Sequence, residues 1–314
     1  MLPSSRTAVV RHRAVTSLPA QLWDAPRYRP SVASVTLPGF GEAGPAALRT
    51  GACCAWSLRS DPTCAAQARR IFRDAAAAAG VPEVLADDGV TMASELAANT
   101  LHAAADPEFG SALPFPGSPE MWLYLRRSAF GWELTCKFFD GLRGWRKGLP
   151  PAQGRVSDDC ETGRGLQVVA ALSDGRWGHH LTRSRLGGWK VPGKAVWFAV
   201  PVPPPATAAG EWEARSRMGP CEAAAELAAM LGDRGLSDGL MVTPEPAAGL
   251  AVLSVRCGLT IWSRPGLIAW RTRAGRYQRQ AVADLVDASE QIVCTCEEIS
   301  RGVGAGDTHL TRVR

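Results

Sequence analysis

Hydrophobic and polar positions alternate through two neighbouring segments near the middle of the chain. Apolar side chains recur at every second position in residues 120–128 and again in residues 131–140. This period of two is typical of strands that bury one face. The short break at residues 129–131 predicts that the two strands form an antiparallel hairpin.

Longer segments repeat their apolar residues with the period of a helix. Residues 64–79 and 84–104 follow this pattern, and Asp61-Pro62-Thr63 precedes the first of them as a sequence typical of a helix start. A third helix is expected at 165–173, and shorter strands are expected at 52–58, 177–181 and 194–201. Residues 51–203 are therefore predicted to form one ordered unit of helices and strands.

The remaining segments differ from this unit in composition. Residues 1–50 are rich in Pro, Ser, Arg and Gly without a sustained period, which predicts a poorly ordered tail. Residues 141–162 also lack a period and are typical of a functional lid or of a disordered loop. Pro-rich residues 204–219 predict a stiff linker. A smaller α+β module is expected at 220–304, followed by a tail at 305–314. Within the module, helices are expected at 222–231 and 281–300, and strands at 250–255, 259–263 and 267–271.

Composition and charge narrow the class of protein. The 314 residues carry a net charge of +5 without a basic run, so a nucleic-acid surface is not expected. Nine cysteines form no Cys-x-x-Cys pair and five histidines form no metal-ligand cluster, which favours reduced thiols in a cytoplasmic protein without zinc. No apolar run reaches the roughly 18 residues of a membrane helix, and no secretory signal is expected at the N-terminus.

The second predicted helix carries two polar side chains that are candidates for a catalytic role. Glu95 and Asn99 are four residues apart, so they project from one face of the helix. A carboxylate that orients or deprotonates a hydroxyl, beside an amide oxygen that holds Mg²⁺, is a working pair for phosphoryl transfer. Asp140 then ends a strand, and Gly163 and Gly165 precede the next helix.

These features occur in an order that resembles a known superfamily. The matching features are the Trp56-Ser57-Leu58 strand, the helix run from Ser94 to Ala103, the strand-end Asp140, the Gly163-Arg164-Gly165-Leu166 motif and the strand starting Gly193-Lys194. Together they resemble the ATP-binding domain shared by gyrase, chaperone, histidine-kinase and mismatch-repair proteins, and most of all its anti-sigma-factor serine kinase branch. The resemblance covers about half of the chain.

The resemblance implies both a fold and a set of roles. The fold would be α+β, a two-layer Bergerat-type sandwich with helices on one face of a mixed, mostly antiparallel sheet. Asn99 would hold the Mg²⁺, Glu95 would be the catalytic base, and Asp140 would accept a hydrogen bond from the adenine amine. His102 would either touch the phosphates or pack within its helix. The implied nucleotide-binding residues are Asn99, His102, Asp140, Gly141, Gly144, Gly163, Arg164, Gly165, Leu166 and Lys194.

Two positions depart from the pattern of the family. Ala195 stands where a threonine is usual, and the missing hydroxyl would remove a water-mediated contact to adenine. Leu142 stands where a glycine or serine is common in the first glycine motif. Binding of ATP is therefore expected more firmly than efficient turnover.

The function that the resemblance implies is that of a Mg²⁺- and ATP-binding regulator in transcriptional control. It would act as a serine/threonine protein kinase on a partner protein, such as a sigma factor, an anti-sigma antagonist or a small helix-turn-helix regulator. The alternative is a non-catalytic, ATP-gated interaction module, and homodimer formation stays open. A phospho-accepting histidine kinase and an ATPase acting on nucleic acid are disfavoured, because no dimerisation helix pair precedes the domain and no basic stripe follows it.

Overall fold

An antiparallel five-stranded sheet forms the framework of the first half of the chain. The computed structural model describes residues 48, 50–104, 119–145, 164–187, 189–205, 208–255 and 258–306. Within these ranges, the strand order of the first sheet is β1-β2-β3-β5-β4, and every neighbouring pair is antiparallel. The strands are β1 (Cys53–Ser57), β2 (Glu120–Ser128), β3 (Gly131–Asp140), β4 (Trp177–Arg183) and β5 (Pro192–Pro201).

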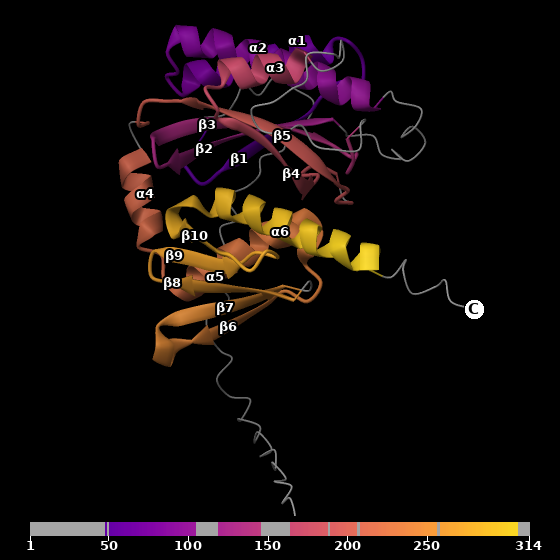
Figure 1. The fold of residues 1–314 in the computed structure, drawn as a ribbon. Helices are drawn as coiled ribbons and strands as arrows, with labels where there is room; N and C mark the ends of the chain where they lie inside the picture. Colours follow the sequence, from indigo (N-terminus) through magenta and orange to yellow (C-terminus); the bar gives the residue numbers. More distant parts are fainter. Residues whose placement is uncertain are drawn as a thin grey trace, which may run out of the picture. The chain divides into compact units, whose positions relative to one another are not determined.

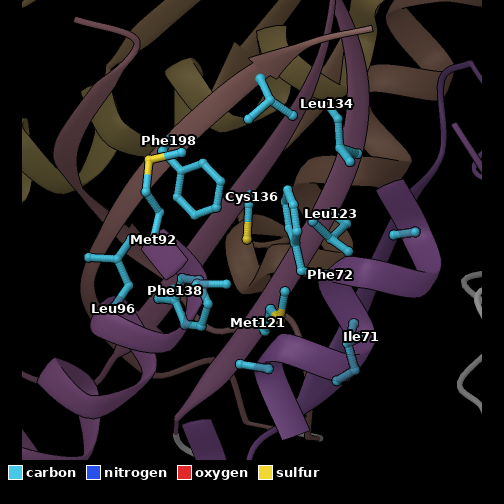
Figure 2. Packing of buried hydrophobic residues seen from close by; sticks show 14 of the residues in the cluster. Ile71, Phe72, Met92, Leu96, Met121, Leu123, Leu134, Cys136, Phe138 and Phe198 are labelled. Atoms are coloured by element: carbon cyan, nitrogen blue, oxygen red, sulfur yellow. The ribbon is translucent and has the colours of Figure 1, made fainter. Parts of the chain in front are cut away.

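Three helices cover one face of this sheet, as Figure 1 shows for α1 (Cys64–Ala78), α2 (Glu83–Ala104) and α3 (Arg164–Leu172). The core between them holds Phe72 from α1 and Met92 and Leu96 from α2 (Figure 2). The Phe72 and Phe198 ring centroids are 5.4 Å apart. Burial of each such side chain contributes about 1.5–3 kcal/mol, so the apolar periods of helix and strand fix how the two layers face each other.

The hairpin and the helices of this half confirm the sequence prediction closely. Strands β2 and β3 have the predicted bounds, and Leu123 lies opposite Cys136. The α+β class is confirmed. The sheet is antiparallel between all neighbouring strands that the structure describes, not mixed. Antiparallel pairing throughout follows from the hairpin and from β5, which lies between β3 and β4.

A second antiparallel five-stranded sheet forms in the C-terminal part, with strand order β10-β9-β8-β7-β6. Its strands are β6 (Met241–Glu245), β7 (Leu250–Val255), β8 (Leu259–Arg264), β9 (Leu267–Arg271) and β10 (Tyr277–Ala281). The helices are α4 (Ala208–Ser216), α5 (Pro220–Leu231) and α6 (Leu285–Gly306), with short helical turns η3 (Gly232–Leu236), η4 (Pro246–Ala248) and η5 (Val282–Asp284). Residues of α5, α6 and the second sheet share one apolar core.

Three of these elements were not predicted. Edge strand β6 was not predicted because it contains Pro244, and edge strand β10 was not predicted because its residues are mostly polar and exposed. Helix α4 lies inside the stretch expected to be a linker at 204–219. It is held by Trp212, whose ring packs edge-on against Trp132 at 5.4 Å and lies under the Arg127 guanidinium. Helix α6 begins four residues after the predicted start at residue 281, because the short helical turn η5 precedes it.

Helix α6 also contacts the first sheet, on the face opposite α1–α3, through a buried acid. The Glu290 side chain is 1% exposed. It forms ion pairs with Arg234, with Arg185 at 2.7 Å and with Lys137 at 3.3 Å. Burial alone would raise the pKa of Glu290, but these three cations hold it well below its usual range.

Apolar contacts surround this ion cluster. Trp122, Tyr124 and Phe139 of the first sheet pack in one buried group with Val286 of α6. The Arg185 and Arg234 guanidinium groups lie 5.3 and 4.9 Å from the Trp122 ring centroid. The second face of the first sheet is thus covered by side chains that match it in charge as well as in shape. No helix among the described residues is long and apolar enough to cross a membrane.

Truncation of the central acid should therefore cost far more stability than truncation of a surface acid. We expect Glu290→Ala to lower the free energy of unfolding by about 3–5 kcal/mol, because three buried cations lose their counter-charge. Glu213→Ala is the matched control, since Glu213 is 70% exposed in its pair with Arg217, and a change within about 0.5 kcal/mol is expected. Urea unfolding followed by circular dichroism measures both. Equal effects of the two substitutions would show that the cluster does not hold the sheet and α6 together.

Candidate functional site

A cavity of about 160 Å³ opens where α2 and the start of α3 face the end of β3 and the start of β5. The last turns of α2 serve both sides of the helix: Asn99, His102 and Ala103 line the cavity, and Leu101 packs against the apolar core. Six residues that sequence analysis assigned to nucleotide binding line it: Asn99, His102, Asp140, Gly144, Leu166 and Lys194. Asn99 and Asp140 are 41 positions apart in the sequence, and the fold brings them to one hollow.

Glu95 and Asn99 meet the glycine motif at the start of α3. A Cβ atom placed on Gly165 would lie 2.8 Å from Glu95 Oε2 and 3.0 Å from Asn99 Nδ2. Gly165 itself is buried. The absence of a side chain at this position therefore lets the α3 backbone approach both polar groups, which a larger residue would displace. Three predicted elements of the site, the carboxylate, the amide and the glycine, are in contact range.

Asp140 lies at the other end of the cavity and already has partners. Its Oδ1 accepts hydrogen bonds from Lys194 Nζ at 2.7 Å and from the Leu142 amide at 3.0 Å. Lys194 Nζ also donates to the Leu142 carbonyl oxygen at 3.1 Å. Burial raises the pKa of Asp140, and the nearby Lys194 ammonium opposes this rise. A carboxylate has about four lone-pair sites, so Asp140 keeps acceptor capacity beyond these two bonds.

Aromatic and basic groups close the cavity beside this ion pair. Lys194 Nζ lies 5.3 Å from the Trp145 ring centroid. The Trp145 ring packs edge-on against His179 at 4.9 Å. His102 is exposed and lines the cavity. Of the two readings left open for His102, the position at the cavity rim agrees with a ligand contact better than with packing inside the helix.

The other predicted residues have different positions. Gly141 is described and partly buried, but it is not among the cavity-lining residues. Gly163 lies outside the described residues, and Arg164 is described only as the first residue of α3. Arg143, three residues after Asp140, pairs with the buried Glu297 of α6. Its charge is thereby neutralised by the C-terminal part.

The expected effect of Ala195 is corrected by the structure. Ala195 is fully buried on the sheet face that α6 covers, in one apolar group with Phe139 and Val286. Because side chains alternate along a strand, the neighbours Lys194 and Val196 face the cavity. A hydroxyl at position 195 would not reach the cavity, so its absence takes nothing from the site. Leu142, the second departure, does line the cavity.

Sequence reasoning missed half of the cavity lining. The additional residues are Leu96, Thr100, Ala103, Leu142, Trp145 and Val196. Ala103 lies four residues after Asn99 and could have been found by extending that helix face by one turn. Trp145 lies in the segment without periodicity, where no sequence signal places a side chain.

The polar groups of the cavity include the Asn99 amide, the His102 ring and the Asp140–Lys194 pair. Among the described residues, no group of three or more His, Cys, Asp and Glu side chains could hold a metal ion. An amide oxygen such as that of Asn99 is a ligand for Mg²⁺ when phosphate oxygens supply the other ligands. Asp140 supplies an acceptor at the opposite end. Comparison of the sequence with protein-family models and with curated proteins finds no match.

Removal of Lys194 should destabilise the protein in a pH-dependent way. In Lys194→Met the buried Asp140 carboxylate loses its cation, and a loss of about 3–5 kcal/mol is expected at pH 7. Because the pKa of Asp140 is raised in the folded state, the folded protein retains the proton where the unfolded chain, with a pKa near 4, releases it. The penalty should therefore grow as the pH rises above about 4 and be smaller at pH 5 than at pH 7.

Thermal unfolding across this pH range provides the measurement, and the double variant Lys194→Met/Asp140→Asn is the control. The double variant has no carboxylate at position 140, so it should recover part of the loss and show a flatter pH profile. A loss in Lys194→Met that is the same at pH 5 and pH 7 would mean that Asp140 does not depend on this lysine.

Proposed function

We propose that the cavity binds ATP with Mg²⁺ and that the protein is a cytoplasmic regulator which transfers phosphate to a serine or threonine of a partner protein. The observation that carries this proposal is the meeting of Asn99 and Asp140 at one cavity, with Glu95 and Asn99 against Gly165. The antiparallel sheet with three helices on one face agrees with a Bergerat-type fold, which is part of the proposal.

The residues present fit the two ends of the nucleotide. Asp140 would accept a hydrogen bond from the exocyclic amine of adenine, beside the apolar Leu142 and Val196 side chains. Asn99 would hold Mg²⁺, and the open backbone at Gly165 would leave room for phosphate oxygens near the N-terminus of α3. The cavity is smaller than the roughly 300–1,000 Å³ of typical ligand pockets, so it suits the base, and the triphosphate would extend beyond it.

Bound ATP supplies the phosphoryl group, and Mg²⁺ neutralises its developing charge. The chain's own contribution is a base and a fixed geometry. Glu95 is partly exposed on the same helix face as Asn99, which leaves it accessible to a hydroxyl of a partner protein. It would take the proton from that hydroxyl, as a positioned carboxylate does in general base catalysis.

A non-catalytic gate is the second candidate function. It is favoured by the pairing of Arg143, three residues after Asp140, with Glu297 of α6. Through this pair a change in the loop that follows β3 would reach the C-terminal part directly. In this reading a sigma factor, an anti-sigma antagonist or a helix-turn-helix regulator would bind differently with and without ATP, and no phosphate would be transferred.

Nucleotide binding should depend on both ends of the cavity. We expect isothermal titration with Mg²⁺ to give tighter binding of ATP than of GTP, because the oxygen at position 6 of guanine cannot donate to Asp140. Asn99→Ala and Asp140→Asn should each weaken ATP binding roughly 10- to 100-fold, the range for a lost charge-assisted hydrogen bond. Gly165→Val should also weaken it, because its side chain would displace Glu95 and Asn99. Thr91→Ala, an exposed position of the same helix, is the control. Wild-type affinity in all three site variants would refute the nucleotide site.

Catalysis and gating differ in their dependence on Glu95. Glu95→Gln keeps the size of the side chain and removes the base, so phosphate transfer from labelled ATP to a partner should fall about 10²- to 10⁴-fold while ATP binding persists. Glu83→Gln makes the same change at an exposed position of α2 and should leave transfer unaltered. If no candidate partner is labelled by the wild type while ATP changes partner binding equally in wild type and Glu95→Gln, the gate is correct and the kinase is not.

A further inference from the structure

A second and larger cavity lies on the opposite face of the first sheet, where α6 and the second sheet meet it. Its volume is about 330 Å³, within the range of small-molecule sites. It is lined by Arg126, Lys137 and Trp197 of the first sheet, by Trp270 of β9 and by Asp287 and Glu290 of α6. We name it the α6 cavity. The exposed residues Gln278 and Glu298 also line it, so its rim reaches solvent.

Two buried polar atoms belonging to this lining have no hydrogen-bond partner among the residues that the structure describes. They are the indole Nε1 of Trp270 and the hydroxyl Oγ1 of Thr272. The Trp270 side chain is fully buried. An indole N–H can only donate, and a buried donor without an acceptor costs about 1–3 kcal/mol. Both residues line the same cavity, so a ligand whose acceptor is placed against these two atoms would satisfy them.

The charged groups of the lining define the other requirement on a ligand. Arg126 is already paired with Glu133 at 2.9 Å, and Lys137 with Glu290 at 3.3 Å. Burial and the neighbouring Lys137 lower the pKa of His180 to about 4, so this ring is neutral near pH 7. Glu290 is paired with Arg185 and Arg234 as well as with Lys137, and Asp287 lies 3.7 Å from Arg126. The carboxylate that remains to attract a cation is that of Glu298, which is exposed at the rim. A ligand with a positive group as well as an acceptor is therefore favoured.

The lining of the α6 cavity also contains aromatic side chains. The Trp197 and Trp270 indoles both line the α6 cavity, and the Arg126 guanidinium lies 5.0 Å from the Trp197 ring centroid. Indole faces bind apolar groups and also attract cations. The lining thus offers donors for an acceptor, a carboxylate for a cation and flat surface for an apolar side chain.

We propose that the α6 cavity is a binding site for a small zwitterion, a free α-amino acid with an apolar side chain. Its carboxylate would accept from Trp270 and Thr272, and its ammonium group would face the Glu298 carboxylate at the cavity rim. This proposal does not rest on the nucleotide site, because the two cavities share no lining residue.

The test is isothermal titration of the full chain with each of the standard amino acids, together with thermal unfolding. At least one apolar amino acid should bind saturably and raise the unfolding temperature. Phenylalanine is compared with phenethylamine and 3-phenylpropionate, and leucine with 3-methylbutylamine and 4-methylpentanoate, each of which lacks one charge. These analogues should bind at least about tenfold more weakly than the parent amino acid.

Two variants locate the site and one controls for it. Thr272→Val removes only the hydroxyl and Trp270→Phe keeps an aromatic ring in the core, and each should weaken binding roughly three- to tenfold, as for one lost hydrogen bond. Trp262→Phe, on the neighbouring strand and away from the lining, should leave the affinity unchanged. Absence of binding by every amino acid, equal binding of the single-charge analogues, or unchanged affinity in Thr272→Val would each overturn the proposal.

Discussion

The buried carboxylate of Glu290 is the interaction on which the arrangement of the chain depends. It draws Lys137 of β3, Arg185 after β4 and Arg234 after α5 to one point, and these four residues come from four separate segments. Buried ion clusters rarely add stability over an apolar interface, but they tolerate few alternative arrangements. The cluster therefore specifies which face of the first sheet receives α6, while the apolar groups around it supply most of the favourable free energy.

Both cavities are consequences of this two-sided burial. Helices α1–α3 pack on one face of the first sheet and α6 packs on the other, so β3 and β5 are covered on both faces. Alternate residues of β5 accordingly serve different purposes: Lys194 reaches the cavity beside Asp140, and Ala195 packs toward α6. Trp197 then lines the cavity on the α6 side. Asp140 and Lys194, the ion pair of the first cavity, lie at the end of β3 and near the start of β5.

The sequence predicted those parts that depend on local spacing. The β2–β3 hairpin, helix α2 and the shared face of Glu95 and Asn99 all follow from periods of two and of 3.6 residues. It did not predict the Asp140–Lys194 pair or the Glu290 cluster, because their members are distant in the sequence and carry no local pattern. Edge strand β10 was missed for a related reason: a polar strand is recognised only by the neighbour that it pairs with. The role expected for position 195 was wrong because the motif alone does not show which face of the strand this residue occupies.

The segment predicted to be a proline-rich linker contains helix α4, whose side chains contact both halves of the chain. Because its Trp212 is seated on Trp132 of the first sheet, and because Arg215 reaches both Glu226 of α5 and the Ala283 carbonyl oxygen, the chain between the two sheets is tied at both ends. A fragment cut at residue 205 would present Trp122, Tyr124 and Phe139 to water beside cations that have lost their acid. The first half is thus poorly suited to being transplanted alone, and fusions or insertions would be tolerated best outside both halves.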